Sequence, residues 1–148
     1  MESLTEQLAE AFIACTLPKA AWTHQAHLRV GLWHLLHASP PEALAQLRQR
    51  ISRYNIACGI ENTASQRYHE TITQFYVWLI DQFLQHADRS QSIDQLAEQL
   101  IDRFGDPSFP FRYYSRDRLM SKAARLEWVD PNLQPLASFL NLSITPVG

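Results

Sequence analysis

Helix-start signals recur along the chain, each followed by apolar residues at helical spacing, and they restrict its fold more than any other feature. Ser3 with Glu6 has the pattern of a capping box, and Ser39 precedes two prolines and Glu42 in a second such signal. No stretch alternates apolar and polar residues strongly enough to build a sheet. The sequence therefore predicts an all-α fold.

The start and stop signals divide the chain into five main helices and some short C-terminal ones. The main helices are expected over about residues 4–17, 24–38, 40–58, 66–87 and 93–104, and the short ones near 116–126 and 131–140. Gly59 is expected to end the third helix in a left-handed conformation, which glycine adopts without a steric penalty. The stretch DPSFPFRYY, residues 106–114, is expected to be a loop packed onto the bundle.

Length and composition favour a single compact domain over residues 1–148. The chain has 148 residues, of which 46% are hydrophobic, and this is enough material for one sizeable core. The formal net charge of -2 provides no basic field of the kind that attracts a phosphate backbone. Nucleic acid is therefore not an expected partner.

The two cysteines and the amino terminus favour a cytoplasmic protein. Cys15 and Cys58 are too few for a disulfide framework and too far apart for a CxxC pair. No apolar run approaches the roughly 18 residues of a membrane span, and MESLTEQLAEAF lacks the positive region of a signal peptide. A membrane is therefore not expected as a partner, and no feature predicts the oligomeric state.

Four of the six histidines lie in WTHQAHLRVGLWHLLH, residues 22–37. His24 and His27 stand on neighbouring turns of the expected helix, so they could bind one metal ion. His34 and His37 lie too far along the axis to share that ion and are interpreted as packing or surface residues. The pair alone is weak support for a metal, because backbone groups or water also satisfy buried imidazoles.

A second polar cluster, RYHET, lies at residues 67–71 near the start of the fourth expected helix. If the starts of the second and fourth helices meet, His69 joins His24 and His27 as a third nitrogen ligand for Zn, Ni or Fe. Glu70 would then serve as a general base or a fourth ligand. His69 is favoured as the ligand, because adjacent residues on a regular helix diverge by about 100°. In the alternative interpretation, Glu70 complements the helix dipole and His69 bonds within the bundle.

Four further residues are candidates for binding a small molecule. Arg112 and Arg116 lie in the basic stretch FRYYSRDRLMSKAAR and could recognise a carboxylate or phosphate, or could belong to a solvated basic face. Asn62 and Tyr68 precede or enter the fourth helix and could form a pocket wall. Asparagine in such a linker is also ordinary turn chemistry.

Four blocks of the sequence carry a family resemblance. They are WTHQAHL at 22–28, RYNIACGIENT at 53–63, RYHETIT at 67–73 and YYSRDRLMSKAAR at 113–125. Together they resemble a small uncharacterised bacterial all-α family. The resemblance implies a shared fold and one composite site, because the blocks hold nearly all the polar candidates above, but it implies no activity.

The sequence is compatible with two functions and lacks the motifs of several others. GxGxxG, GxxxxGK, GxSxG and HExxH are all absent. The first function is a pocket that binds a divalent metal or a small anionic molecule, with metal-assisted hydrolysis as its simplest chemistry and Arg112 or Arg116 orienting the substrate. The second is a nonenzymatic interaction module whose histidines are structural. Its exposed aromatic residues, Phe109, Phe111 and Tyr114, would contact a partner protein.

Overall fold

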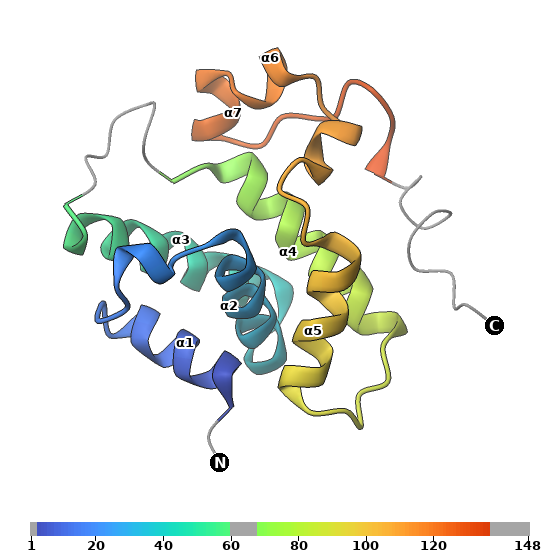
Figure 1. The fold of residues 1–148 in the computed structure, drawn as a ribbon. Coiled ribbons are helices and arrows are strands. Elements are labelled where there is room, and N and C mark those ends of the chain that lie inside the picture. The colour runs from blue at the N-terminus through green and yellow to red at the C-terminus, as the bar shows by residue number, and fades with distance from the viewer. Residues whose placement is uncertain (1–2, 60–67, 137–148) are drawn as a thin grey trace.

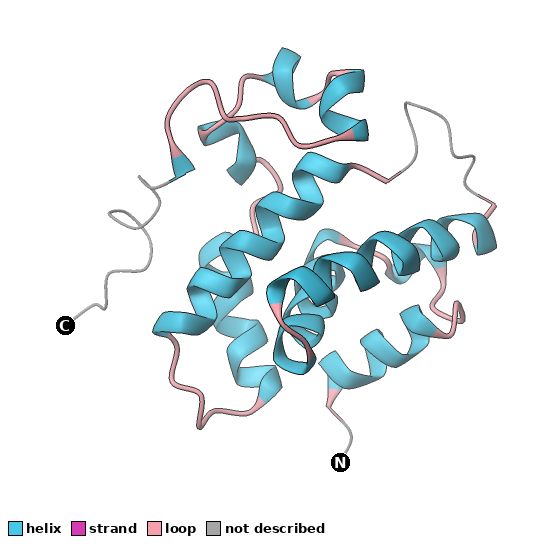
Figure 2. Cartoon of the chain, turned by 180° about the vertical axis from the view of Figure 1, so that it is seen from behind, coloured by secondary structure: helices cyan, strands magenta, loops and turns pink. Residues whose placement is uncertain are grey.

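The computed structural model describes residues 3–59 and 68–136, and every regular element within them is helical (Figures 1 and 2). The long helices are α1 (Leu4–Ile13), α2 (His24–His37), α3 (Pro40–Ala57), α4 (Glu70–His86) and α5 (Ile93–Phe104). The short elements are the α-helices α6 (Arg116–Leu119) and α7 (Lys122–Leu126) and the 3-10 helices η1 (Lys19–Ala21) and η2 (Phe109–Arg112). The all-α prediction is confirmed. None of the described helices combines the length and the hydropathy needed to cross a bilayer.

Side-chain caps determine where most of the long helices begin. The hydroxyls of Ser3, Thr23 and Ser39 each accept a hydrogen bond from the backbone N–H three residues further along. Ser92 does the same for α5, and the side chain of Gln95 completes its capping box. These bonds satisfy amides that the helices themselves leave unpaired, so the starts follow from local sequence.

Helix α2 lies inside the bundle and contacts α1, α3, α4 and α5. Leu28 and Leu32 are fully buried on it. Gly31 lies where α2 passes α4, and a Cβ atom there would be 2.9 Å from Cδ1 of Ile80. The missing side chain therefore allows the two helices to approach closely.

Gly59 ends α3 as the sequence predicts, with a φ of +76°. A Cβ atom at this position would meet nothing within 4 Å, so the need for glycine is conformational. Gly59→Ala is therefore expected to lower the free energy of unfolding by about 1 kcal/mol. Urea unfolding measures this loss, and Gly59→Asn should lose less, because asparagine tolerates the left-handed region. An alanine variant as stable as the wild type would contradict this explanation.

The fourth helix begins later than predicted, at Glu70 rather than near residue 66. His69 has extended backbone angles, φ −117° and ψ 107°, and its ring accepts a hydrogen bond from the N–H of Ile72. His69 is thus the N-cap of α4. The expectation that His69 and Glu70 are neighbours on a regular helix is therefore wrong.

The C-terminal helices also differ from the prediction. The single helix expected over 116–126 is two helices, because the hydroxyl of Ser121 accepts from the N–H of Ala124 and starts α7. Residues 131–136 form no α-helix, since their polar groups bind residues 112–115 instead. The remainder of the helix expected over 131–140 lies outside the described residues.

The aromatic stretch 106–114 packs onto the bundle, as predicted. It contains η2, and the ring of Phe109 packs against those of Phe104 and Phe75. Phe109 is 4% exposed and Tyr114 is 0% exposed, while Phe111 is half-buried. The exposed aromatic surface expected for an interaction module is therefore wrong, because Phe109 and Tyr114 belong to the core.

Candidate ligand-binding site

The starts of α2 and α4 lie beside one pocket with a volume of about 250 Å³. His24, His27 and His69, the three histidines singled out in the sequence, all contribute to its lining. Tyr68 also lines it. The other described lining residues are Trp22, Leu28, Val30, Gly31, Leu47, Ile51, Asn55, Ile72, Thr73, Tyr76, Val77 and Ile80. The pocket is mostly apolar, and no Asp, Glu, Lys or Arg is among these described lining residues.

Both ring nitrogens of His69 are already bonded. Nδ1 accepts from the N–H of Ile72 at 3.1 Å, so Nε2 carries the hydrogen and donates to the carbonyl of Leu119 at 2.7 Å. Burial lowers the pKa of His69, although the hydrogen bond to Leu119 acts in the opposite direction. The ring is therefore neutral near pH 7. His69 could bind a metal ion only by giving up one of these two bonds.

His24 has a buried ring nitrogen without a hydrogen-bond partner among the described residues. Burial lowers its pKa, while a hydrogen bond to the carbonyl of Phe104 and the charge of Asp106 oppose that change. Nε2 is buried and has no hydrogen-bond partner in the described part of the chain. In a neutral imidazole one nitrogen carries the hydrogen, so Nε2 is free either to accept a hydrogen bond or to donate one.

Tyr76 carries the second unpaired polar atom of the lining. Its hydroxyl oxygen is buried and has no hydrogen-bond partner among the described residues. The ring centroids of Tyr76 and His24 are 5.5 Å apart, in an edge-to-face arrangement. Buried polar groups are almost always hydrogen-bonded, so two unpaired ones on adjacent side chains of a pocket require an explanation.

His27 lies next to His24 with its ring against Trp22, at a centroid distance of 4.2 Å. Solvent reaches His27, although protein atoms surround most of the ring. Loss of hydration to these protein atoms is the main cause that lowers the pKa of His27, and the charge of the nearby His24 is the second. Among residues 3–59 and 68–136, no three His, Cys, Asp or Glu side chains form a group that could hold a metal ion.

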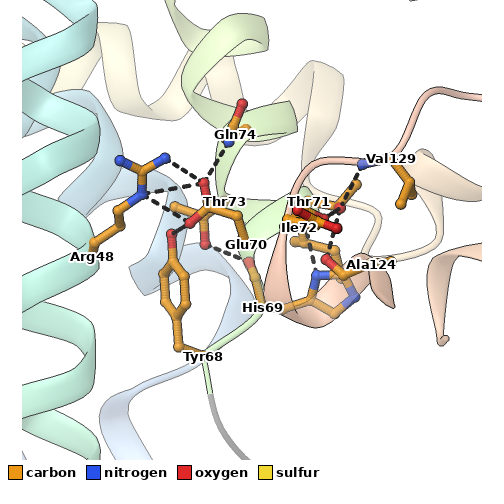
Figure 3. A network of polar contacts seen from close by, with 11 residues as sticks. Arg48, Tyr68, His69, Glu70, Thr71, Ile72, Thr73, Gln74, Ala124 and Val129 are labelled. Carbon is orange, nitrogen blue, oxygen red and sulfur yellow. Dashed lines mark hydrogen bonds and ion pairs between the residues drawn. The ribbon is translucent and has the colours of Figure 1, made fainter. Parts of the chain in front are cut away.

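Glu70 lies outside this pocket lining, in a polar network between α3 and α4 (Figure 3). Arg48 of α3 donates to its two carboxylate oxygens, from Nε at 2.8 and 3.1 Å and from Nη2 at 2.5 Å. The hydroxyl of Tyr68 donates at 2.7 Å, and the amide of Gln74 donates as well. Tyr68 thus belongs both to this network and to the lining of the pocket.

The pKa of Glu70 reflects two opposing effects. Burial raises it, but the hydrogen bonds from Arg48, Gln74 and Tyr68 outweigh burial and leave the pKa below its ordinary value. Glu70 is therefore ionised and fully occupied near pH 7. This is the environment of a structural carboxylate, because a general base needs a free lone pair facing its substrate.

Thr71 completes a run of four residues that are all engaged in the fold. Its hydroxyl lies between the carbonyls of Ala124 and Glu127, at 2.7 and 2.9 Å, and accepts from the N–H of Val129 (Figure 3). With His69 bound to Leu119, these bonds attach the C-terminal helices to the start of α4. The YHET segment, residues 68–71, therefore joins α3, α4 and the C-terminal segment.

The remaining predicted ligand-binding residues lie elsewhere. The Cζ atom of Arg112 lies 5.0 Å from the ring centroid of Phe109, and that of Arg116 lies 4.8 Å from the ring centroid of Phe111. Neither arginine is among the described lining residues. Asn62 lies outside the described residues. Tyr76 was not among the predicted site residues, although it follows Thr73 at helical spacing on the same face of α4.

His34 and His37 have structural partners, as the sequence analysis interpreted them. His34 is fully buried, donates from Nδ1 to the carbonyl of Val30 at 2.7 Å and accepts from Arg50 at Nε2. His37 is exposed and stacks on Trp33 at a centroid distance of 4.1 Å. The histidines of α2 thus belong to two environments, one at the pocket and one in and around the core.

A comparison of Tyr76 with Tyr114 tests whether the hydroxyl of Tyr76 contributes to stability. Tyr76→Phe is expected to leave the free energy of unfolding unchanged or to raise it, because no hydrogen bond is lost. Tyr114→Phe removes a bond from its hydroxyl to the carbonyl of Val129 and should cost about 1 kcal/mol. Urea unfolding of both variants measures the difference. An equal loss in both would mean that the Tyr76 hydroxyl has a structural partner.

The fold and the pocket define a class of protein, a helical domain with a mostly apolar pocket between two of its helices. Comparison with protein-family models, with curated proteins and with solved structures gives no match for this chain. Its function is therefore inferred from the geometry of the pocket itself.

Proposed function

We propose that the domain binds a small organic molecule in the pocket between α2 and α4. The observation that carries the proposal is the pair of buried, unpaired polar atoms on two lining residues, Nε2 of His24 and the hydroxyl oxygen of Tyr76. A bound molecule would supply the missing hydrogen bonds. A mostly apolar cavity with a few polar groups is also the usual form of a small-molecule site.

Binding rather than catalysis is proposed, because the predicted general base is otherwise engaged. Glu70 is held by Arg48, Tyr68 and Gln74 away from the pocket lining. The predicted substrate-orienting residues Arg112 and Arg116 are not in that lining either. The predicted hydrolytic mechanism needs Glu70 and either Arg112 or Arg116 at the pocket.

A divalent metal ion is the second candidate for the occupant. It is favoured by His24 and His27, which lie one turn apart on α2 and both line the pocket. Two imidazoles are fewer ligands than structural or catalytic zinc sites use, so such an ion would need further ligands from water or a bound molecule.

Thermal unfolding distinguishes these occupants. Phenol is expected to raise the unfolding midpoint with concentration, because a ligand that binds only the native state stabilises it by mass action. Ile51→Trp, which enlarges a half-buried wall residue, should abolish the rise. A midpoint that falls with a chelator, rises with Zn²⁺ and loses both responses in His24→Ala would replace the organic ligand by a metal ion.

A further inference from the structure

We propose that the ligand is an uncharged molecule of one or two rings bearing a hydroxyl group, which lies between His24 and Tyr76. This inference depends on the proposed function and adds the chemical class of the ligand. Three properties of the pocket support it: the charge of its walls, its volume, and the hydrogen-bonding state of its two unpaired atoms.

The walls favour an uncharged ligand. No Asp, Glu, Lys or Arg lies among the described lining residues, and the lowered pKa values of His24, His27 and His69 keep these lining histidines neutral near pH 7. A carboxylate or an ammonium group entering this pocket would lose its hydration without gaining an opposite charge. The small anionic ligand expected from the sequence therefore fits these walls less well than a neutral one.

The volume and the wall composition set the size and polarity of the ligand body. An apolar cavity of about 150 Å³ can hold benzene. The present cavity of about 250 Å³ is larger, which corresponds to one or two rings. Trp22, Val77 and Ile80 supply the aromatic and aliphatic surface that such rings contact.

The two unpaired atoms need complementary partners. Nε2 of His24 accepts a hydrogen bond or donates one, depending on which ring nitrogen carries the hydrogen. The hydroxyl of Tyr76 can donate. A ligand hydroxyl can donate to one of these atoms while it accepts from the other, whichever ring nitrogen of His24 carries the hydrogen, whereas an ether or ketone oxygen can only accept. A hydroxyl is therefore the simplest group that satisfies both.

The experiment compares phenol with toluene, which has the same ring and no polar atom. Affinities of both are measured by calorimetry at pH 7.5 for the wild type, Tyr76→Phe and Tyr114→Phe. Tyr76→Phe is expected to weaken phenol binding about tenfold and toluene binding less than twofold. Tyr114→Phe, whose hydroxyl bonds Val129 outside the lining, should change neither affinity. Should Tyr76→Phe not fold, His24→Leu provides the same comparison.

Benzoate and benzylammonium complete the series and separate the two proposals. If either charged probe binds more tightly than phenol, the ligand class is wrong, although the pocket still binds small molecules. Equal losses of phenol and toluene affinity in Tyr76→Phe would likewise overturn the hydroxyl assignment. If none of the four probes binds the wild type, the proposed function itself fails.

Discussion

Acidification from pH 7 to pH 4 is expected to remove about 3 kcal/mol of the free energy of unfolding through His34 alone. Burial lowers the pKa of His34 from 6.5 to about 4. The hydrogen bond to Val30 opposes this change, and the positive charge of Arg50 adds to it. Each pKa unit corresponds to about 1.4 kcal/mol. His34 is fully buried, so solvent screening does not reduce this effect.

The sign follows from the protons bound in each state. Between about pH 6.5 and pH 4 the unfolded chain binds a proton at His34 that the native ring excludes, so stability falls as the pH falls through this window. The loss ends below the native pKa. His24, His27 and His69 also have lowered pKa values and act in the same direction.

Urea unfolding at several pH values measures this linkage in the wild type and in His34→Gln. The variant is expected to show a pH dependence shallower by up to one proton, whatever its stability at pH 7. His86→Gln, at an exposed position at the end of α4, is the matched control and should keep the wild-type slope. If stability depended on pH equally in the wild type and His34→Gln, His34 would take up its proton as readily in the native protein as in the unfolded chain, and this explanation would be wrong.

Arg48→Met is expected to lower the free energy of unfolding by about 2 kcal/mol at neutral pH. The substitution leaves the Glu70 carboxylate, whose side chain is 9% exposed, with only Tyr68 and Gln74 as partners. The Arg48 side chain is 46% exposed, so the loss is smaller than for a fully buried ion pair. Chemical denaturation measures it, with the exposed Arg89→Met as the control.

The pH dependence identifies the carboxylate as the cause. The native pKa of Glu70 lies below its ordinary value of 4.5, so its stabilising effect is present above pH 4.5 and is lost as the pH falls through the native pKa. The difference between the wild type and Arg48→Met should therefore shrink below pH 4.5. The double variant Arg48→Met/Glu70→Met should recover much of the loss, because no charge remains buried. A double variant no more stable than the single one would contradict this explanation.

Local signals predicted the helices well, because capping depends on residues three or four positions apart. Ser39 accepts from the N–H of Glu42 and Ser92 from that of Gln95, as their spacing indicates. Gly59 has the expected positive φ. The cap formed by His69 was not predicted, because histidine is not a usual N-cap residue and its second hydrogen bond is to Leu119, 50 residues further along the chain.

The candidate site was predictable in position but not in chemistry. Polar clusters at two helix starts indicated where the pocket lies, and its lining includes His24, His27 and His69. The partner of Glu70 could not be read from the sequence, because Arg48 is 22 residues away and on another helix. The unpaired hydroxyl of Tyr76 depends on how α2, α4 and α5 pack, which no local pattern specifies.

A titration of the methyl-labelled protein with phenol, followed by NMR, tests most directly whether the pocket between α2 and α4 binds a small molecule. The binding account predicts saturable shifts of the Leu28, Val77 and Ile80 methyl resonances, with those of Leu96 and Leu100 on α5 unchanged. Shifts that are absent, that do not saturate, or that are as large on α5 as in the pocket would contradict it.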